Sequence, residues 1–476
     1  MFRFSSIKDY HNALQNGQTT CVEAVHFYLA AIKERPQLNA FLEVFESEAI
    51  AEAGRLDAKR LAGAPIGKMH GVVVGIKDVI CYKGHIVSAG SKILENFKSI
   101  YHATVVEKLL QEEAIIIGRQ NCDEFAMGSS NENSAFGAVR NALDESRVPG
   151  GSSGGSAVSV QAKLTMISLG SDTGGSVRQP ADFCGVVGLK PSYGRISRYG
   201  LIAYASSFDQ IGIFAKSVAD AAICLEVISG EDDFDSTVSV KPVPAYATAL
   251  DQAPKKYRIA YFRQALEHPG LDPEIKATIS NLIDRLKLEG HQVDPIEFEL
   301  LNHIVPTYYV LTTAEASSNL SRFDAIRFGY RAPLVNPTLN ELYKASRTAG
   351  FGKEVQRRIM LGTFVLSAGY FDAYFTKAQQ VRRILYNKSV DVFKDYDAII
   401  SPTVPSTAFK IGEKSDDQVA MFLADIYTVF ANLVGIPAIS IPLFTHSNGL
   451  PFGLQIMTNH FEETAMLQLS DQLMHS

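Results

Sequence analysis

Two glycine- and serine-rich clusters and one upstream lysine are the groups in this sequence that could do chemistry. The clusters span residues 149–156 and 171–176, with Ser152 in the first and Ser176 in the second, and Lys77 lies well before both. A serine hydroxyl becomes a nucleophile when a base removes its proton, and a lysine can be that base when burial lowers its pKa. Since no histidine lies in or between the clusters, the pattern indicates acyl transfer by serine and lysine.

Such clusters are most often loops or linkers, but here both adjoin apolar runs typical of a protein core. Glycine-rich turns can direct backbone N–H groups at a phosphate or at an oxyanion. No phosphate-binding G-x-x-x-x-G-K-[ST] occurs, and no G-x-G-x-x-G follows an expected strand. An oxyanion hole beside Ser176 is the favoured use, with Thr173, Gly174 and Gly175 as its donors.

Residues 150–154 match the G-x-S-x-G pattern that places a nucleophilic serine on a turn after a strand. The preceding residues, 141–147, are polar and do not predict a strand, so Ser152 is not expected to be the nucleophile. Lys77 follows the apolar run 72–76. It is therefore expected at the end of a buried strand, and the alternative is a surface lysine at a strand terminus.

Apolar spacing predicts the elements that must position these groups. Helices are expected over residues 6–13, 20–34, 46–61, 104–113, 217–229 and 273–289, and strands over 72–76, 114–118, 165–169, 257–262, 398–400 and 438–441. Thr20 is expected to cap the second helix, with Glu23 as its reciprocal partner. Continuous apolar strands that alternate with helices predict a sheet covered on both faces. Residues 230–235 and 241–244 are turn-rich and form the best candidate joint.

The composition excludes several classes of protein. The formal net charge is −6, so the chain has no basic footprint for nucleic acid, and bound RNA would be held by a partner. The five scattered cysteines predict neither a disulfide framework nor a metal site. With no signal peptide and no apolar run of about 18 residues, we expect a cytoplasmic protein without membrane contact.

Together these residues resemble the amidase signature family. The resemblance is carried by Lys77 and residues 150–156, 172–180 and 184–191. It implies one large α/β/α domain over residues 1–476, with a central mixed twisted sheet covered by helices on both faces. Residues 1–65 would be a helical lead-in, residues 66–230 the signature core, and residues 231–476 the part that completes sheet and pocket.

The resemblance also implies roles for individual residues. Ser176 would be the nucleophile and Lys77 the base, while Ser152, which follows a cis peptide in this family, would relay the proton. The backbone from Thr173 through Gly174 and Gly175 to Ser176 would form the oxyanion hole. Asp172 and Arg178 would hold this loop in place.

Further segments are similar to one branch of the family, the A subunits of bacterial glutamyl-tRNA(Gln)/aspartyl-tRNA(Asn) amidotransferases. They are residues 123–134, 197–203, 314–324, 357–363 and 425–428, and the departures are Val79, Cys122 and Phe430. This likeness implies glutamine as the substrate, bound by Tyr309, Arg358 and Asp425. The neighbouring Tyr308 and Arg357 stay open as alternatives.

The same likeness implies that backbone around Gly128 and Ser129 touches the ligand, and that the chain works within a heterotrimer. Glutaminase activity here would supply ammonia to a B subunit that binds tRNA, ATP and magnesium, and a small C subunit would clamp the two together. No cofactor or metal is expected in this chain. The product could be Gln-tRNA, Asn-tRNA or both. A free-standing amidase for another small amide and a catalytically silent scaffold remain alternatives.

Overall fold

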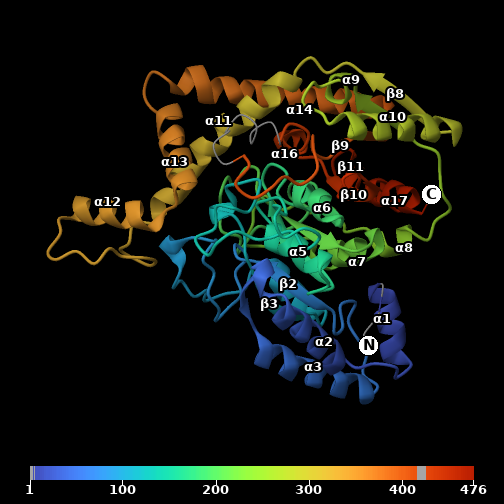
Figure 1. Cartoon of the computed structure of the whole chain (residues 1–476), viewed down its shortest axis with the longest axis horizontal. Coiled ribbons are helices and arrows are strands. Elements are labelled where there is room, and N and C mark those ends of the chain that lie inside the picture. Colours follow the sequence, from blue (N-terminus) through green and yellow to red (C-terminus); the bar gives the residue numbers. More distant parts are fainter. Residues whose placement is uncertain (1–3, 5, 415–424, 476) are drawn as a thin grey trace.

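The computed structural model describes residues 4, 6–414 and 425–475. Within them, eleven strands form one sheet in the order β1-β3-β2-β4-β6-β5-β10-β11-β9-β7-β8. Figure 1 shows β2 and β3 in the N-terminal part of the molecule and β10 and β11 in the C-terminal part. The strands are β1 (Phe41–Val44), β2 (Val73–Lys77), β3 (Ile115–Gln120), β4 (Ile167–Asp172), β5 (Val187–Lys190), β6 (Gln210–Ala215), β7 (Arg258–Phe262), β8 (Gln292–Ile296), β9 (Ala398–Pro402), β10 (Ala438–Thr445) and β11 (Pro451–Met457). The sheet is mixed: β2 pairs in parallel with β3 and β4, whereas β4 pairs antiparallel with β6.

Helices occupy most of the chain between the strands. The α-helices are α1 (Ile7–Gln15), α2 (Cys21–Glu34), α3 (Glu46–Leu61), α4 (Thr104–Gln111), α5 (Gly154–Gln161), α6 (Arg178–Cys184), α7 (Val218–Ile228), α8 (Tyr246–Ala249), α9 (Arg263–Leu266), α10 (Pro273–Leu288), α11 (Leu301–Asn319), α12 (Leu339–Gly350), α13 (Lys353–Val365), α14 (Lys377–Asp395), α16 (Val429–Val434) and α17 (Glu463–Met474). The short helices are η1 (Pro36–Leu38), η2 (Lys92–Leu94), η3 (Glu124–Ala126), η4 (Leu320–Arg322) and the π-helix η5 (Asp372–Thr376). None of the helices within the described ranges combines the length and the apolar character needed to cross a membrane.

The sheet buries apolar side chains on both of its faces. Successive side chains of a strand point to opposite faces, and in β6 Ile213 packs in the cluster that includes Leu225 of α7, whereas Phe214 packs in the cluster that includes Val158 of α5. The same alternation in β3 sends Ile117 toward the helices α2 and α3. Helices therefore cover both faces of a mixed sheet, which confirms the predicted fold class.

The predicted helices and strands are all present, with ends shifted by a few residues. The capping box at Thr20 and Glu23 is confirmed. Residues 230–245 connect α7 to α8 without a helix or strand. The lead-in before residue 65 holds the three predicted helices and also an unpredicted strand, because β1 pairs antiparallel with β3. Its four half-buried residues are too short a run for periodicity to separate a strand from a helix.

Candidate active site

The sheet topology brings Lys77 to the second glycine/serine cluster. Lys77 is the last residue of β2 and Asp172 the last residue of β4, and these strands are parallel neighbours. Parallel neighbours end at the same edge of a sheet, so Lys77 faces the loop that contains Ser176. Ser152 lies in the loop just before α5, and no strand leads into this loop. This confirms the rejection of a nucleophile elbow at Ser152.

Lys77 is fully buried among serine hydroxyls. Its Nζ donates to Ser152 Oγ at 2.7 Å, to Ser153 Oγ at 2.9 Å and to Ser171 Oγ at 2.9 Å. Burial lowers the pKa of Lys77 to about 8, because desolvation disfavours the ammonium form. The alternative of a surface lysine is therefore wrong, and a neutral amine is accessible near neutral pH. The Gly151–Ser152 peptide bond is cis.

A buried ion pair holds the loop between β4 and α6. Asp172 accepts hydrogen bonds from the backbone N–H of Gly175 at 2.8 Å and of Val177 at 3.1 Å, and Arg178 Nη2 donates to it at 3.0 Å. Burial by itself raises the pKa of Asp172, but the Arg178 guanidinium lowers it to about 2. Arg178 also donates to the Thr428 carbonyl and so ties the loop to the C-terminal part.

We predict that Arg178→Met destabilises the protein by about 3–5 kcal/mol, because it leaves the buried Asp172 carboxylate without its cation. The measurement is the free energy of unfolding from urea denaturation. Arg263→Met is the control: Arg263 pairs with Glu297 at the surface, so the expected change is within about 1 kcal/mol. Equal losses in the two variants would contradict the role assigned to the buried pair.

The loop leaves three backbone N–H groups available. Those of Thr173, Gly174 and Ser176 have no protein acceptor within the described residues, whereas Gly175 N–H is engaged by Asp172. A Cβ on Gly174 would lie 2.5 Å from Tyr308 Cζ, so glycine permits the close approach of that ring. Ser176 is 8% exposed, and its Oγ makes no hydrogen bond within the described part of the chain. The loop thus offers free amides beside a reachable hydroxyl.

A second group of polar side chains converges on Asp425. Ser129 Oγ donates to Asp425 Oδ1 at 3.0 Å and Tyr309 Oη donates to Oδ2 at 2.9 Å. Burial raises the pKa of Asp425 to about 6. The turn that begins at Asp425 is joined to the serine loop, because Thr428 Oγ1 donates to the Gly174 carbonyl at 2.6 Å. Gly128 lies against Asp123, whose carboxylate a Cβ at that position would meet at 2.4 Å.

Arg358 supplies a buried cation close to this carboxylate. Its guanidinium lies 5.3 Å from the centroid of the Tyr309 ring, and its Nη1 donates to Tyr204 Oη at 2.8 Å. Arg357, one position earlier on α13, has a side chain that is 40% exposed and pairs with Glu354. Between the two alternatives left by the sequence, the geometry favours Arg358. It likewise favours Tyr309, since Tyr308 packs against Gly174.

Two positioning carboxylates are not among the residues that the sequence indicates. Asp209 accepts from Thr173 Oγ1 at 2.7 Å and from the Tyr204 backbone N–H at 2.9 Å, and so links the serine loop to the partner of Arg358. Glu354 accepts from Arg358 Nε at 2.8 Å. The spacing of Glu354 and Arg358, four residues apart on a helix, is a usable signal. Asp209 offers none, because its contacts come from distant segments.

Comparison with known proteins agrees with this architecture. A model of the amidase family matches residues 23–467. The chain is 51% identical to the A subunit of glutamyl-tRNA(Gln) amidotransferase from Koribacter versatilis over 98% of this chain and 96% of the relative, and 48% identical to that of Chlorobium phaeobacteroides over 99% of each. The solved structure of the corresponding A subunit from Thermotoga maritima superposes with a TM-score of 0.77 at 40% identity, covering 94% of this chain and 93% of that one. The chain therefore belongs to the amidase family, among the glutamyl-tRNA(Gln) amidotransferase A subunits.

Proposed function

We propose that this chain is the glutaminase subunit of a tRNA-dependent amidotransferase. One observation supports the choice of substrate: a buried cation, Arg358, and a buried carboxylate, Asp425, both contact Tyr309 beside the loop of Ser176. A free amino acid presents an α-carboxylate and an α-ammonium together. Such a pair of opposite charges is recognised by complementary buried charges. In this proposal the side chain of glutamine extends from these two charges to Ser176.

The chemistry follows from the serine loop. Ser176 Oγ attacks the side-chain carbonyl carbon, and Lys77 in its neutral form takes the serine proton through Ser152. The oxyanion is stabilised by the backbone N–H groups of Thr173, Gly174 and Ser176, since that of Gly175 already donates to Asp172. When the C–N bond breaks, the proton returns to the amine, and ammonia leaves. Water then hydrolyses the glutamyl ester, which releases glutamate and frees Ser176.

In this proposal Arg358 binds the α-carboxylate of glutamine, and Asp425 binds the α-ammonium together with Tyr309. Backbone around Gly128 and the hydroxyl of Ser129 complete the head-group site, since Ser129 already contacts Asp425. The raised pKa of Asp425, about 6, leaves it ionised at neutral pH. It can then pair with an ammonium group.

The ammonia is used by a partner. We propose that a B subunit binds tRNA, ATP and magnesium, activates the glutamyl group of Glu-tRNA(Gln) and amidates it, while a small C subunit joins the two proteins. What supports this is the name of the relatives, A subunits of a glutamyl-tRNA(Gln) amidotransferase, which the chain matches over nearly their full length. The net charge of −6 is consistent with tRNA being held by another chain.

Ammonia release separates this function from its alternatives. The full chain is assayed with glutamine and with other small amides, alone and with its co-expressed B and C subunits. We expect glutamine to be the preferred substrate and its hydrolysis to increase in the complex. Full activity of the chain alone on a different amide would indicate a free-standing amidase. No ammonia from any amide, even in the complex, would indicate a silent scaffold.

We predict that Arg358→Gln raises the KM for glutamine about 100-fold with little change in kcat, because it removes a buried charged contact to the carboxylate but leaves the reacting amide untouched. Steady-state kinetics of ammonia release measure both constants. The control is Arg357→Gln, on the same helix but 40% exposed, with an expected KM change of less than about threefold. An unchanged KM in Arg358→Gln would refute the assignment of the carboxylate anchor.

A further inference from the structure

We infer that Glu124 is a positioning residue for substrate specificity: it holds the start of α13 and thereby aims Arg358 at the α-carboxylate of the substrate. The inference rests on the proposed function and deepens it. Glu124 lies in η3, more than two hundred residues before α13 in the chain, and touches no reacting atom of the proposed mechanism. Glu124 would therefore affect substrate binding only through the position of α13.

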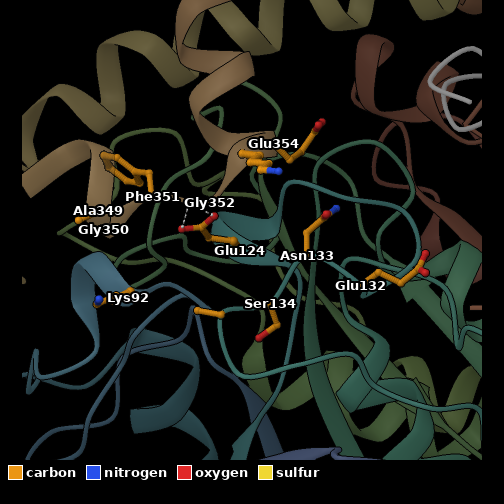
Figure 2. Close-up of a pocket in the computed structure, with 12 residues that line it drawn as sticks. Lys92, Glu124, Glu132, Asn133, Ser134, Ala349, Gly350, Phe351, Gly352 and Glu354 are labelled. Atoms are coloured by element: carbon orange, nitrogen blue, oxygen red, sulfur yellow. Dashed lines mark hydrogen bonds between the residues drawn. The ribbon is translucent and has the colours of Figure 1, made fainter. Parts of the chain in front are cut away.

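Glu124 is a buried carboxylate that spans two segments. It is 2% exposed. The backbone N–H of Gly352 donates to both of its oxygens, at 3.1 Å and 2.8 Å, and Ser91 Oγ donates to one of them. Ser91 Oγ also donates to the Gly350 carbonyl at 3.3 Å. Figure 2 shows the Glu124 carboxylate directed at Gly352, with both contacts drawn.

Gly352 is the residue that caps the N-terminus of α13. Glycine has no side-chain oxygen that could accept a hydrogen bond from the first N–H groups of the helix, and no side-chain cap is present at this end. A carboxylate at a helix N-terminus satisfies a free N–H group and interacts favourably with the helix dipole. The fit is close, because a Cβ on Gly352 would lie 2.4 Å from Glu124 Oε2. The N-terminal end of α13 is thus in direct contact with Glu124 through its capping residue, Gly352.

The same helix carries the carboxylate anchor. Arg358 lies six residues after Gly352, or about 9 Å along a helix axis, and faces inward to Tyr204. Glu354, in the first turn, orients it by accepting from Nε at 2.8 Å. A shift of the first turn would therefore move both Glu354 and Arg358. Arg358 keeps its orientation only if the start of α13 keeps its position.

One side of this first turn is not packed by protein. A pocket of about 330 Å³ is lined by Gly352, Lys353 and Glu354 on one wall, and by Lys92, Glu132 and Asn133 among its other walls (Figure 2). Because the pocket leaves space beside the helix start, packing does not fix the turn from that side. Glu124 itself lines this pocket, and the bonds from Gly352 N–H to its carboxylate are a polar contact that holds the helix start beside the open space.

The experiment compares two substrates that differ only in the α-carboxylate: glutamine and 4-aminobutanamide. For Glu124→Ala in the complex of the full chain with its B and C subunits, we expect the KM for glutamine to rise about tenfold with kcat nearly unchanged. The kinetics with 4-aminobutanamide should not change. Glu124→Gln keeps an acceptor for Gly352 and should restore most of the loss. Glu132→Ala, in the same pocket but off the helix, should leave both substrates unaffected.

A double-mutant cycle tests whether Glu124 acts through Arg358. In an Arg358→Gln background, Glu124→Ala should have no further effect on kcat/KM for glutamine. Additive effects, an unchanged KM for glutamine, or an equal loss with the two substrates would overturn the inference. If Glu124→Ala does not fold, Ser91→Ala weakens the same carboxylate and should raise the KM for glutamine alone, by about threefold. Absence of glutamine hydrolysis in the unsubstituted complex would instead overturn the proposed function.

Discussion

Ser176→Ala is expected to lower the kcat for ammonia release from glutamine by about 10⁴-fold or more, the scale seen when a serine nucleophile is removed. No neighbouring group can replace its hydroxyl, because Ser152 is buried and engaged with Lys77 at 2.7 Å. Binding should survive, since Arg358 and Asp425 are intact. The expected signature is loss of kcat with glutamine affinity preserved, measured by single-turnover kinetics and by equilibrium binding.

Ser156→Ala is the matched control. Ser156 is a buried serine of the first cluster that donates to the Leu169 carbonyl and is not among the three serines bonded to Lys77 Nζ. Its replacement should change kcat by less than about threefold. In the intact protein, quenching during turnover should trap a glutamyl ester on Ser176. Undiminished ammonia release from Ser176→Ala would refute the mechanism.

Lys77→Met is expected to lower kcat by about 10³-fold, within the range for loss of a general base. Its amine must be neutral to accept a proton. Since burial lowers its pKa to about 8, activity of the intact protein should rise with pH through about 8. The residual activity of Lys77→Met should lose that dependence. Profiles of kcat/KM between about pH 6 and pH 10 measure the effect, and the same rise persisting in Lys77→Met would assign it to another group.

The Lys77→Met variant should fold. In the native protein the pKa of Lys77 lies below its ordinary value of 10.5, so the unfolded state binds more protons between about 8 and 10.5 and stability falls as pH decreases through that window. Methionine removes this loss of stability at neutral pH.

Ser153→Ala is the control for the relay: Ser153 also contacts Lys77, at 2.9 Å. Its kcat should fall far less than that of Ser152→Ala.

The predictability of the site differs from residue to residue. Lys77 could be placed at a buried strand end because a run of apolar residues precedes it, and a strand of this kind is covered on both faces. Glu354 and Arg358 could have been linked by their helical spacing. In contrast, Asp209 and Glu124 look like ordinary acidic residues in the sequence. Their significance depends on contacts with Thr173 and Gly352, which no local pattern indicates.

Local sequence patterns were enough to predict six of the eleven strands, six of the helices and the type of chemistry. Apolar periodicity, capping residues and glycine clusters act over a few neighbouring residues, so they can be recognised before the fold is known. Which side chains meet depends instead on the folded chain. Tyr309 and Asp425 are 116 residues apart, and Ser129 and Asp425 are 296 apart. They come together because of the order of the strands and because α11 packs against α16 in the folded chain. The choice of Arg358 over Arg357 has the same origin, since it rests on which face of α13 is buried.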